Sequence, residues 1–332
     1  MVQQFTDFTR SCLSYSMPHN NSYGNCPNEL IRGRSPLISI LIVNYRSYTE
    51  LHQCLLSVHP YLADDLEVRV VDHESDPVQA ADLIRTFPWV DLIARDDNPG
   101  FAGGVNRGAQ GAHGTYLLLL NPDCIMEGDV AHSLAAWMDT NPRVGVCGAR
   151  VREADGSLQP SARRFPDATT GVAGRTSWLS RVWPRNWLTT RNLTTPSTSG
   201  EPESVDWVSG ACMMVRRTAF DDVGGMDAHF FLYWEDADLC RRLNQKGWTT
   251  VYNAASSVTH LTNRSAARAP VRSQVAFHQS AFRYFLKHSG MVARLAAPFV
   301  FLALSVRLLF KLVLLISKSR AQGLTKPPSI SE

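Results

Sequence analysis

The stretch LISILIVNY at residues 37–45 indicates the fold class of this 332-residue chain. It is short, almost entirely apolar and rich in β-branched residues, which is typical of a strand buried on both faces of a parallel sheet. Similar segments follow at 66–75 (LEVRVVDHES), 90–97 (VDLIARDD) and 114–124 (GTYLLLLNPDC), with helical patterns between them. Strands that alternate with helices predict an α/β fold with a mostly parallel, doubly wound sheet.

Polar side chains stand at the carboxyl end of each of these strands. They are Asn44, Asp72, Asp96 or Asp97, and Asp123. Ligands of doubly wound sheets bind outside the carboxyl ends of the strands. The sequence therefore predicts one ligand site along this edge of the sheet.

The segments around this pattern divide the chain into three parts. Residues 1–34 are polar and show no secretory-signal pattern, so we expect a flexible N-terminal segment, to which we assign no role. The α/β domain is expected over 35–270. It includes a long excursion at 160–203, rich in Ser, Thr, Arg and Trp. Residues 271–332 are predicted to form a C-terminal helical tail.

Composition limits the classes of function. Hydrophobic content of 44% and charged content of 19% are typical of a globular protein. A net charge of +3 is too small to indicate nucleic-acid binding. The 7 cysteines include no CxxC pair, so neither a zinc cluster nor a disulfide framework is predicted. Isolated cysteines fit a reducing cytosol.

The most apolar stretch, residues 291–317, lies in the tail. Its uncharged part, 295–306, is shorter than the roughly 20 residues that span a bilayer. On a helix, Arg307, Lys311 and Lys318 fall on one side, opposite Phe and Leu. This amphipathic pattern predicts a helix lying in the membrane interface with its basic side chains reaching the phosphates. The alternative is a helix packed on the α/β domain or on a partner.

The NPD at 121–123 places a carboxylate at the end of a buried strand. Asp123 could therefore be an oxygen ligand of Mg²⁺ or Mn²⁺, ions that usually keep waters and bridge substrate phosphates. The alternative is an ordinary Asn-Pro-Asp turn. The glycine-rich segment at 97–108 is neither GxGxxG nor a P-loop. Its glycines, Gly100 among them, permit close approach of backbone to a ligand.

The segment WEDADLCRRL at 234–243 places three acids at the start of a predicted helix. Helix starts favour acids in any case, because of the macrodipole. The preceding HFFLYW and the turn-forming GGMD nevertheless favour a function. Asp236, partly desolvated beneath this cover, is predicted to accept a proton, with Glu235, Asp238 and Trp234 in supporting roles.

His260 ends the last predicted strand, WTTVYNAASSVTH at 248–260. A neutral imidazole there could complete the coordination shell of a metal. A polar strand-end histidine without a ligand role is the equal alternative.

The chain resembles the family 2 inverting glycosyltransferases of GT-A fold, in particular their bacterial rhamnosyltransferase-like branch. The resemblance runs from about residue 36 to 260 and depends on ordered motifs. They are SILIVNYRS, VVDHESDP, DNPGFAGGVNRG, LLLLNPD, DWVSGACMMVRR, GGMDAHFFLYWEDADLCRRL and VTH. No single motif is decisive, but seven in the right order and spacing are specific.

The resemblance implies roles on the nucleotide side of the site. It implies that Asp72 helps to hold the nucleotide base and that Asn44 and Asn98 lie near the nucleotide, with Gly100 in the glycine-rich segment beside it. One departure is that the family's VVDN is VVDH here. His73 therefore replaces an amide that orients the donor.

The resemblance also implies the chemistry. It assigns Asp123 to the metal and the nucleotide sugar, Asp236 to the catalytic base and His260 to the metal shell. A second departure is that the usual DXD is reduced to NPD, so metal binding depends on one acid. The implied mechanism is a direct displacement that inverts the anomeric centre.

The resemblance favours L-rhamnose from dTDP-L-rhamnose as the donor, with galactofuranose, mannose or another nucleotide sugar as alternatives. The expected acceptor is a glycan or a polyprenyl-diphosphate-linked sugar of bacterial cell-surface polysaccharide synthesis. Three tryptophans interleaved with arginines in the excursion suit such an acceptor, although a solvent-facing flap is equally compatible. We expect a cytoplasmic protein, peripheral on the inner face of the cell membrane.

Two other classes of protein remain alternatives. A nucleotidyltransferase needs a basic, glycine-rich loop after the first strand, and LIVNYRSYTE contains no glycine. A non-catalytic nucleotide-sugar-binding protein has no need of both Asp123 and Asp236.

Overall fold

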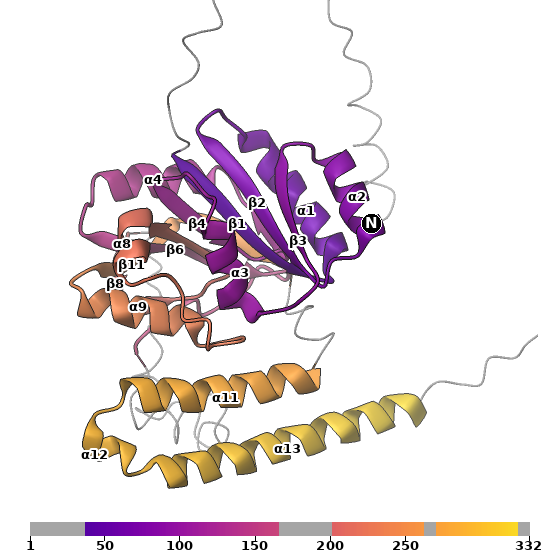
Figure 1. Cartoon of the computed structure of the whole chain (residues 1–332), viewed down its shortest axis with the longest axis vertical. Helices are drawn as coiled ribbons and strands as arrows, with labels where there is room; N and C mark the ends of the chain where they lie inside the picture. Colours follow the sequence, from indigo (N-terminus) through magenta and orange to yellow (C-terminus); the bar gives the residue numbers. More distant parts are fainter. Residues whose placement is uncertain (1–36, 166–200, 262–269, 325–332) are drawn as a thin grey trace, which may run out of the picture. The chain divides into compact units, whose positions relative to one another are not determined.

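The computed structural model describes residues 37–165, 201–261 and 270–324. The predicted flexible segment 1–34 and the tryptophan- and arginine-bearing part of the excursion lie outside these residues. The first half of the described chain alternates strands and helices as expected (Figure 1). Its elements are β1 (Ile38–Tyr45), α1 (Tyr48–Val58), a 3₁₀ turn (His59–Tyr61), β2 (Leu66–His73), α2 (Pro77–Thr86), β3 (Val90–Arg95), α3 (Gly100–Ala109), β4 (Tyr116–Leu120), β5 (Cys124–Met126) and α4 (Val130–Asp139).

The second half adds strands before and after the excursion and ends in helices. Its elements are β6 (Val144–Glu153), β7 (Ala162–Arg163), β8 (Glu203–Val205), β9 (Trp207–Val208), β10 (Cys212–Arg216), α8 (Arg217–Asp222), α9 (Glu235–Gln245), β11 (Thr249–His260), α11 (Pro270–His288), α12 (Met291–Arg294) and α13 (Ala297–Leu324).

One large mixed sheet has the order β3-β2-β1-β4-β10-β6-β11-β5, with β8 paired to β11. Strands β1 to β4 pair in parallel, and β6 and β11 point the same way. Strand β10 runs antiparallel between β4 and β6, and the short strands β5 and β8 are antiparallel to β11. The predicted mostly parallel sheet is therefore confirmed, with these strands as antiparallel additions. A second small sheet, β7 with β9, joins the two edges of the excursion.

Strand β1 shows why its sequence is apolar throughout. Ile38, Ile40 and Ile42 pack into a cluster with α1, α2 and α4. Leu41 and Val43 point to the other face and pack with α3, α8 and α9. Helices thus cover both faces of the sheet, and both sets of strand side chains lose contact with water.

The carboxyl ends of β1, β2 and β3 lie side by side. The register pairs Asn44 with Asp72, and pairs His73 with both Tyr45 and Arg95. The polar residues at the strand ends are therefore neighbours in space, as the sequence indicated. Asp97 is an exception, because its side chain is exposed and pairs with Arg95 at 2.7 Å.

Helix α11, the first helix of the predicted tail, is bonded to the loop before α9. Tyr233 Oη and Ser273 Oγ are 2.7 Å apart, and Ser280 Oγ donates to the carbonyl of Leu232 at 3.0 Å. Helix α11 thus packs directly on the α/β domain and belongs to the same compact unit, which begins at residue 35. The division at residue 270 stays a prediction.

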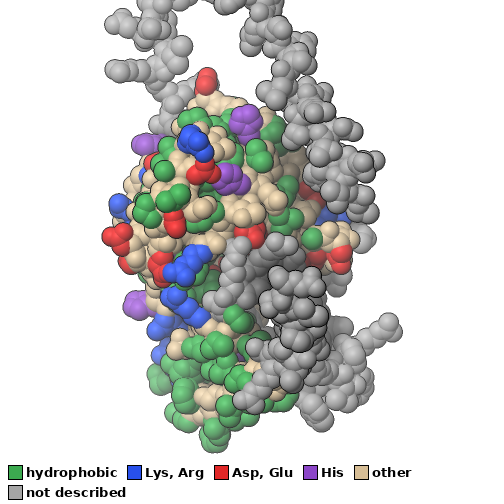
Figure 2. Space-filling view, turned by 90° about the vertical axis from the view of Figure 1, so that its right-hand side faces the viewer, with side chains coloured by type: hydrophobic (Ala, Val, Ile, Leu, Met, Phe, Trp, Pro, Cys, Tyr) green, Lys and Arg blue, Asp and Glu red, His purple; other side chains and the backbone are tan. Residues whose placement is uncertain are grey.

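Helix α13 changes the interpretation of the apolar stretch. Its segment Ala297–Ser317, 21 residues, is long and apolar enough to cross a membrane, by length and composition only. The exclusion of a span by length was therefore wrong, because Arg307 and Lys311 do not end the helix. The Arg307 guanidinium lies 5.5 Å from the ring centroid of Phe277, so this basic residue packs on α11. The opposite face is apolar and exposed, and Figure 2 shows hydrophobic side chains gathered there.

Candidate active site

A cavity of about 190 Å³ lies at the carboxyl edge of the sheet. Its walls come from β1, β2, the start of α3, the NPD turn, the end of β11, the loop before α9 and the first turn of α11. Its lining includes His73, Asn98, Gly100, Asp123 and His260. Elements far apart in sequence therefore converge on the edge predicted to hold a ligand.

Asp123 and His260 face each other at one side of this cavity. Asp123 Oδ1 lies 3.0 Å from His260 Nε2, and both side chains are buried. The contact follows from the pairing of β11 with β5, which sets His260 opposite Cys124. Burial lowers the pKa of His260, but the hydrogen bond and charge of Asp123 outweigh it, so the pKa is raised. The carboxylate and imidazole predicted to share a metal are adjacent.

Cys124 is a third side chain near this pair, and no sequence pattern pointed to it. Its sulfur and the Asp123 and His260 ligand atoms all lie within 4.8 Å of one another. Burial first, and then the charge of Asp123, raises the pKa of the Cys124 thiol well above its usual value. Sulfur is a soft ligand and suits Mg²⁺ or Mn²⁺ less well than the oxygen of Asp123 does.

The donors at this site fit a divalent cation. Asp123 supplies a carboxylate oxygen, the type of ligand that suits Mg²⁺ and Mn²⁺. His260 supplies an imidazole nitrogen, a ligand that is more typical of transition-metal sites than of Mg²⁺ sites. Such ions commonly bind through one or two protein groups, with substrate phosphates and waters in the other positions. Gln159 Oε1 lies 3.2 Å from His260 Nδ1, where it can orient the ring.

The opposite wall of the cavity carries His73, Asn98 and Gly100. His73 is almost fully buried, and its Nε2 has no hydrogen-bond partner among the described residues. Burial, followed by the charge of Arg95, lowers the pKa of His73 and keeps the imidazole neutral. Asn98 Oδ1 accepts from the Gly100 amide at 3.0 Å. A buried, unpaired ring nitrogen at a cavity wall is suited to a polar ligand group.

Gly100 is required by its surroundings. Its φ is +85°, and a Cβ there would come 2.1 Å from the carbonyl oxygen of Phe231. The Phe101 amide donates to that same oxygen at 2.9 Å. The close approach allowed by this glycine is thus to the loop before α9. The expected contact between Gly100 and a nucleotide stays a prediction.

Asn44 and Asp72 are buried beneath the cavity and are absent from its lining. Asp72 accepts hydrogen bonds from Asn44 Nδ2 at 2.7 Å, Tyr48 Oη at 2.6 Å and Ser75 Oγ at 2.5 Å. These bonds hold the ends of β1 and β2 together. A direct contact of Asp72 with a nucleotide base, as the resemblance implies, stays a prediction.

Asp236 lies at the start of α9, beside the cavity wall. Its Oδ2 accepts from the Gly210 amide at 3.2 Å and its Oδ1 from the Ala237 amide at 2.8 Å. A Cβ on Gly210 would lie 3.4 Å from the Phe101 ring and 3.9 Å from the Asp236 Cβ, and Phe101 lines the cavity. Burial raises the pKa of Asp236 despite both amide bonds and the charge of Arg163. A carboxylate with a raised pKa is a stronger base.

The two residues before this helix have a strained backbone. Tyr233 and Trp234 have φ values of 67° and 72°, in the left-handed region that non-glycine residues rarely adopt. Trp234 packs against Phe277 and Tyr284 of α11, with ring centroids 5.8 Å and 5.2 Å away. Such strain persists only where the surroundings enforce it, and it is concentrated at functional sites. Trp234 supports Asp236 through the backbone.

Glu235 is buried, and its Oε2 has no hydrogen-bond partner in the part of the chain that the structure describes. Burial, and then the charge of Asp236, raises the pKa of Glu235 to about 8. Burial and the charge of Asp236 thus favour the neutral form of the Glu235 carboxyl.

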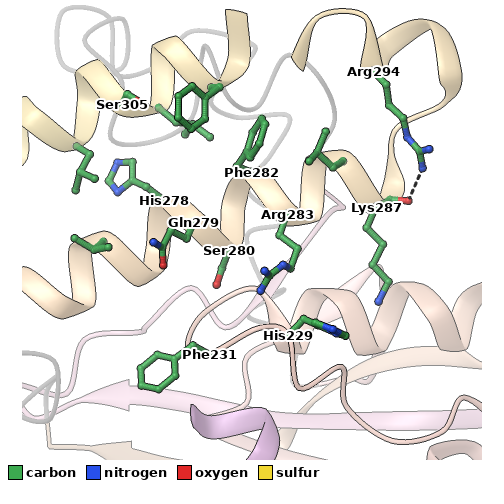
Figure 3. A pocket seen from close by; sticks show the side chains of 15 residues that line it. His229, Phe231, His278, Gln279, Ser280, Phe282, Arg283, Lys287, Arg294 and Ser305 are labelled. Carbon is green, nitrogen blue, oxygen red and sulfur yellow. Dashed lines mark hydrogen bonds between the residues drawn. The ribbon is translucent and has the colours of Figure 1, made fainter. Parts of the chain in front are cut away.

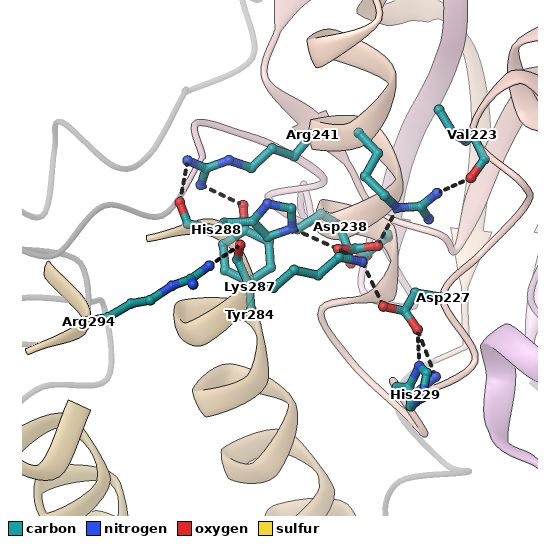
Figure 4. A network of polar contacts seen from close by, with 12 residues as sticks. Val223, Asp227, His229, Asp238, Arg241, Tyr284, Lys287, His288 and Arg294 are labelled. Atoms are coloured by element: carbon teal, nitrogen blue, oxygen red, sulfur yellow. Dashed lines mark hydrogen bonds and ion pairs between the residues drawn. The ribbon is translucent and has the colours of Figure 1, made fainter. Parts of the chain in front are cut away.

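Asp238 joins α9 to α11 (Figure 4). Its side chain is fully buried and bonds Arg242 Nε at 2.7 Å, His288 Nε2 at 2.7 Å and Lys287 Nζ at 2.8 Å. Lys287 also pairs with Asp227 at 2.6 Å. Burial raises the pKa of Asp238, but the bonds to His288, Lys287 and Arg242 outweigh it and lower the pKa. Asp238 thus anchors α11 to α9, and a supporting role in catalysis stays a prediction.

Sequence reasoning missed Arg272, in the first turn of α11. Its guanidinium lies 4.7 Å from the ring centroid of Phe231 and 5.9 Å from that of Tyr45, and all three line the cavity. Within residues 37–165, 201–261 and 270–324, Arg272 has no carboxylate partner. A cation in the same cavity as Asp123 and His260 suits an anionic ligand. The residue was overlooked because α11 was assigned to the tail.

Comparison with known proteins agrees with this geometry. A family model described as "Glycosyl transferase family 2" matches residues 39–224. An N-acetylglucosaminyl-diphospho-decaprenol L-rhamnosyltransferase of Mycobacterium tuberculosis is 31% identical over 76% of this chain and 86% of its own length. The rhamnosyltransferase WbbL of Escherichia coli is 28% identical over 52% of this chain and 59% of its own.

Two solved structures share the fold at 15% sequence identity. A mannosyltransferase from Pyrobaculum calidifontis, in complex with GDP-Man and Mn²⁺, has a TM-score of 0.51, and the match covers 89% of this chain and 82% of its own. GalNAc-T7 with UDP, GalNAc and Mn²⁺ has a TM-score of 0.50, and the match covers 69% of this chain and 44% of its own. The predicted GT-A fold is confirmed, and the chain belongs to glycosyl transferase family 2, with rhamnosyltransferases among its relatives.

Proposed function

We propose that this chain is a metal-dependent, inverting glycosyltransferase that moves L-rhamnose from dTDP-L-rhamnose onto a sugar linked to a polyprenyl diphosphate. The observation that carries the proposal is the arrangement around one cavity. Asp123 and His260 form one wall, and the half-buried carboxylate of Asp236, the proposed base, lies behind another. The 31% identity to a decaprenol-linked rhamnosyltransferase supports the choice of donor and acceptor. The proposed setting is bacterial cell-surface polysaccharide synthesis.

The chain's own residues supply binding and proton transfer. Asp236 accepts the proton of the acceptor hydroxyl as the oxygen attacks the anomeric carbon from the face opposite the leaving group. The raised pKa of Asp236 favours this transfer, and its two amide bonds hold the carboxylate in place. The product therefore has the inverted anomeric configuration.

The leaving group is a nucleoside diphosphate, and its charge has to be stabilised. Asp123 and His260 would hold Mg²⁺ or Mn²⁺, which when bound supplies Lewis-acid stabilisation of that charge. Arg272, beside the same cavity, would add a fixed positive charge. His73 offers a neutral ring nitrogen, and Asn98 an amide, to the nucleotide.

The membrane part of the proposal depends on α13. Its outward face exposes Phe299, Leu302 and Val306 to the extent of 76%, 61% and 60%. Contact of this face with a bilayer would bring the α/β domain to the surface where a polyprenyl-linked acceptor resides. We accordingly propose a protein attached to the cytoplasmic face of the cell membrane.

The test is a panel of nucleotide sugars assayed for Mn²⁺-dependent binding and transfer with wild type and Asp236→Asn. We expect dTDP-L-rhamnose to be preferred. The variant should bind the donor as wild type does but transfer about 10²–10⁴-fold more slowly, the usual contribution of a general base. Asp221→Asn, an exposed acid in α8, is the control. Unchanged turnover in Asp236→Asn would exclude this residue as the base, and preference for another donor would exclude rhamnosyl transfer.

A further inference from the structure

A second and larger cavity, of about 950 Å³, lies along α11. Its walls are one side of α11, the facing side of α13 and the loop at 229–231 that leads into α9 (Figure 3). We refer to this cavity as the α11–α13 groove. It takes no part in the donor chemistry described above.

The α11–α13 groove has two chemically different sides. The side formed by α13 is apolar, with Phe301, Leu304 and Leu308, and the Phe301 ring packs on Phe282 of α11 with centroids 5.4 Å apart. The side toward the α/β domain carries basic groups. Figure 3 shows Arg283 extending from α11 toward the loop at 229–231.

Arg283 is the basic group best placed for an anion. It is exposed and has no carboxylate partner among the residues described. Lys287, by contrast, is already paired with Asp227 and Asp238. Arg294, in α12, donates to the backbone carbonyl of Lys287 at 3.4 Å and also lines the groove. The groove thus joins an apolar trough to a positive charge that is available to a ligand.

The groove and the smaller cavity meet at Phe231, which lines both. The Phe231 carbonyl also accepts the hydrogen bond that ties its loop to α3, and Asp236 follows at the start of the next helix. A molecule lying in the groove with its polar end at Arg283 therefore ends beside the wall that separates it from the donor.

We propose that the α11–α13 groove binds the acceptor, with its isoprenoid chain along α13 and its diphosphate at Arg283. This inference rests on the proposed function. The apolar wall matches a hydrocarbon chain, and the guanidinium matches a diphosphate, which arginine binds in a bidentate manner. The shared wall at Phe231 directs the linked sugar toward Asp236. The two helices assigned by sequence to the tail thereby become part of the substrate site.

The experiment measures direct binding of decaprenyl diphosphate in detergent, without any donor, so it does not depend on the rhamnosyl assignment. Arg283→Gln removes the charge, and Ser305→Trp fills the groove from α13. Ser317→Trp, on the same helix and absent from the groove lining, is the matched control. Isopentenyl diphosphate serves as a ligand with the same diphosphate and almost no chain.

We expect Arg283→Gln to weaken binding of both ligands about tenfold or more, the effect of losing a charge-assisted bond. Ser305→Trp should weaken decaprenyl diphosphate by a similar factor and leave isopentenyl diphosphate unchanged. The Ser317→Trp control should bind both ligands as wild type does. Melting temperatures of all three variants check that each one folds.

Two results would overturn the proposal. One is binding of decaprenyl diphosphate that neither variant weakens. The other is displacement of decaprenyl diphosphate by phosphatidylglycerol vesicles at comparable lipid concentration, which would make the groove a site for bilayer headgroups. If wild type binds decaprenyl diphosphate through Arg283 but transfers no sugar, the groove stands and the proposed function fails.

Discussion

Two regions carry the proposed functional residues of this molecule, and each is held in place in a different way. Asp123 and His260 are fixed by the sheet, because β5 and β11 pair and set them at the same edge. Asp236 lies instead after two residues with positive φ, in a segment that α11 holds from outside. The first region depends on strand register, and the second depends on tertiary contacts. A change in α11 should therefore alter Asp236, the proposed base, while Asp123 and His260, the proposed metal ligands, keep their positions.

The two acids, Asp123 and Asp236, also differ in the groups that stabilise their charge. The Asp123 carboxylate has an imidazole partner 3.0 Å away. Asp236 accepts hydrogen bonds from two backbone amides, and these together with the charge of Arg163 do not offset its burial. At the edge of the sheet, the carboxylate of Asp123 bonds to the imidazole of His260. In the loop, the partners of the Asp236 carboxylate do not offset the cost of its burial. The second arrangement suits a base, since burial that disfavours the charged form of a carboxylate makes it a stronger proton acceptor.

Asp238→Asn should give the largest effect in the loop region. It removes the charge that three basic groups share, and breaking a buried pair in this way typically costs about 3–5 kcal/mol. We expect a lower melting temperature and a large loss of kcat, because α11 no longer holds the Tyr233–Trp234 backbone. Mn²⁺ affinity, measured by electron paramagnetic resonance, should stay within a factor of about two because strand register is unaffected.

The matched control is Asp221→Asn, an exposed acid paired with Arg217 at 3.2 Å. It should change stability by less than about 1 kcal/mol, as exposed pairs do. Equal loss of Mn²⁺ affinity and kcat in Asp238→Asn would show that the two regions are coupled rather than independent.

The sheet-borne part of the site could be predicted from the sequence. The run LLLLNPD specifies a buried strand followed by a carboxylate, and the β11 pattern ends on His260. Parallel strands bring their carboxyl ends to one edge, so local patterns are enough to gather these residues. The end of α9 could also be predicted, since Gly247 adopts a φ of +89° just beyond that helix.

For the segment before and at the start of α9, the sequence predicts that acids are present but not what each acid does. The sequence marks the acids of WEDADL, but Glu235, Asp236 and Asp238 differ in role through burial and through contacts that come from α11. These contacts join segments far apart in the chain, so no local pattern reveals which acid anchors α11, which one favours its neutral form and which one suits the proposed role of base.

The position of Arg272 in the cavity wall could not be predicted from the sequence either. It lies beside Tyr233 in the cavity wall, although the two residues are distant in sequence. The next residue, Ser273, contacts the Tyr233 hydroxyl and so brings this turn of α11 to the site. Sequence periodicity predicts the helix but not the surface on which it packs, because packing depends on tertiary contacts.

Glu235→Gln should give a smaller effect that changes with pH. The pKa of Glu235 is raised to about 8 in the folded protein, so between its unfolded value and about 8 the folded state binds more protons than the unfolded state. The contribution of Glu235 to the free energy of unfolding is therefore fully present below its unfolded pKa, and it is lost as pH rises toward about 8. Glutamine keeps the shape and does not ionise. We expect the variant to melt several degrees higher than wild type near pH 8, with little difference near pH 4.5.

Melting temperature across this pH range is the measurement, with Asp64→Asn, an exposed acid in the turn before β2, as the control. A constant difference between Glu235→Gln and wild type at all pH values would contradict a protonated Glu235. The contrast between the two regions would then change, because the folded protein would no longer favour the neutral form of Glu235.

Ser273→Ala should give the smallest effect, and it tests how α11 holds the loop. It deletes one bond, the 2.7 Å contact between Ser273 Oγ and Tyr233 Oη, and a single hydrogen bond contributes about 0.5–1.5 kcal/mol. Since Tyr233 stays in its left-handed conformation only while its surroundings enforce it, part of this loss should appear in kcat rather than in stability alone. We expect kcat to fall about two- to tenfold, consistent with that energy, with KM for the donor unchanged.

The control for this variant is Ser317→Ala, which removes an exposed hydroxyl of α13 and should match wild type in kcat and KM. The split between kcat and KM decides where α11 acts. Tyr233 and Ser273 also line the cavity proposed for the donor, so an unchanged KM would show that their bond acts on the segment that carries Asp236 rather than on donor binding. A fall in donor affinity with unchanged kcat would mean instead that α11 acts on the edge of the sheet, and the two regions would no longer be separately positioned.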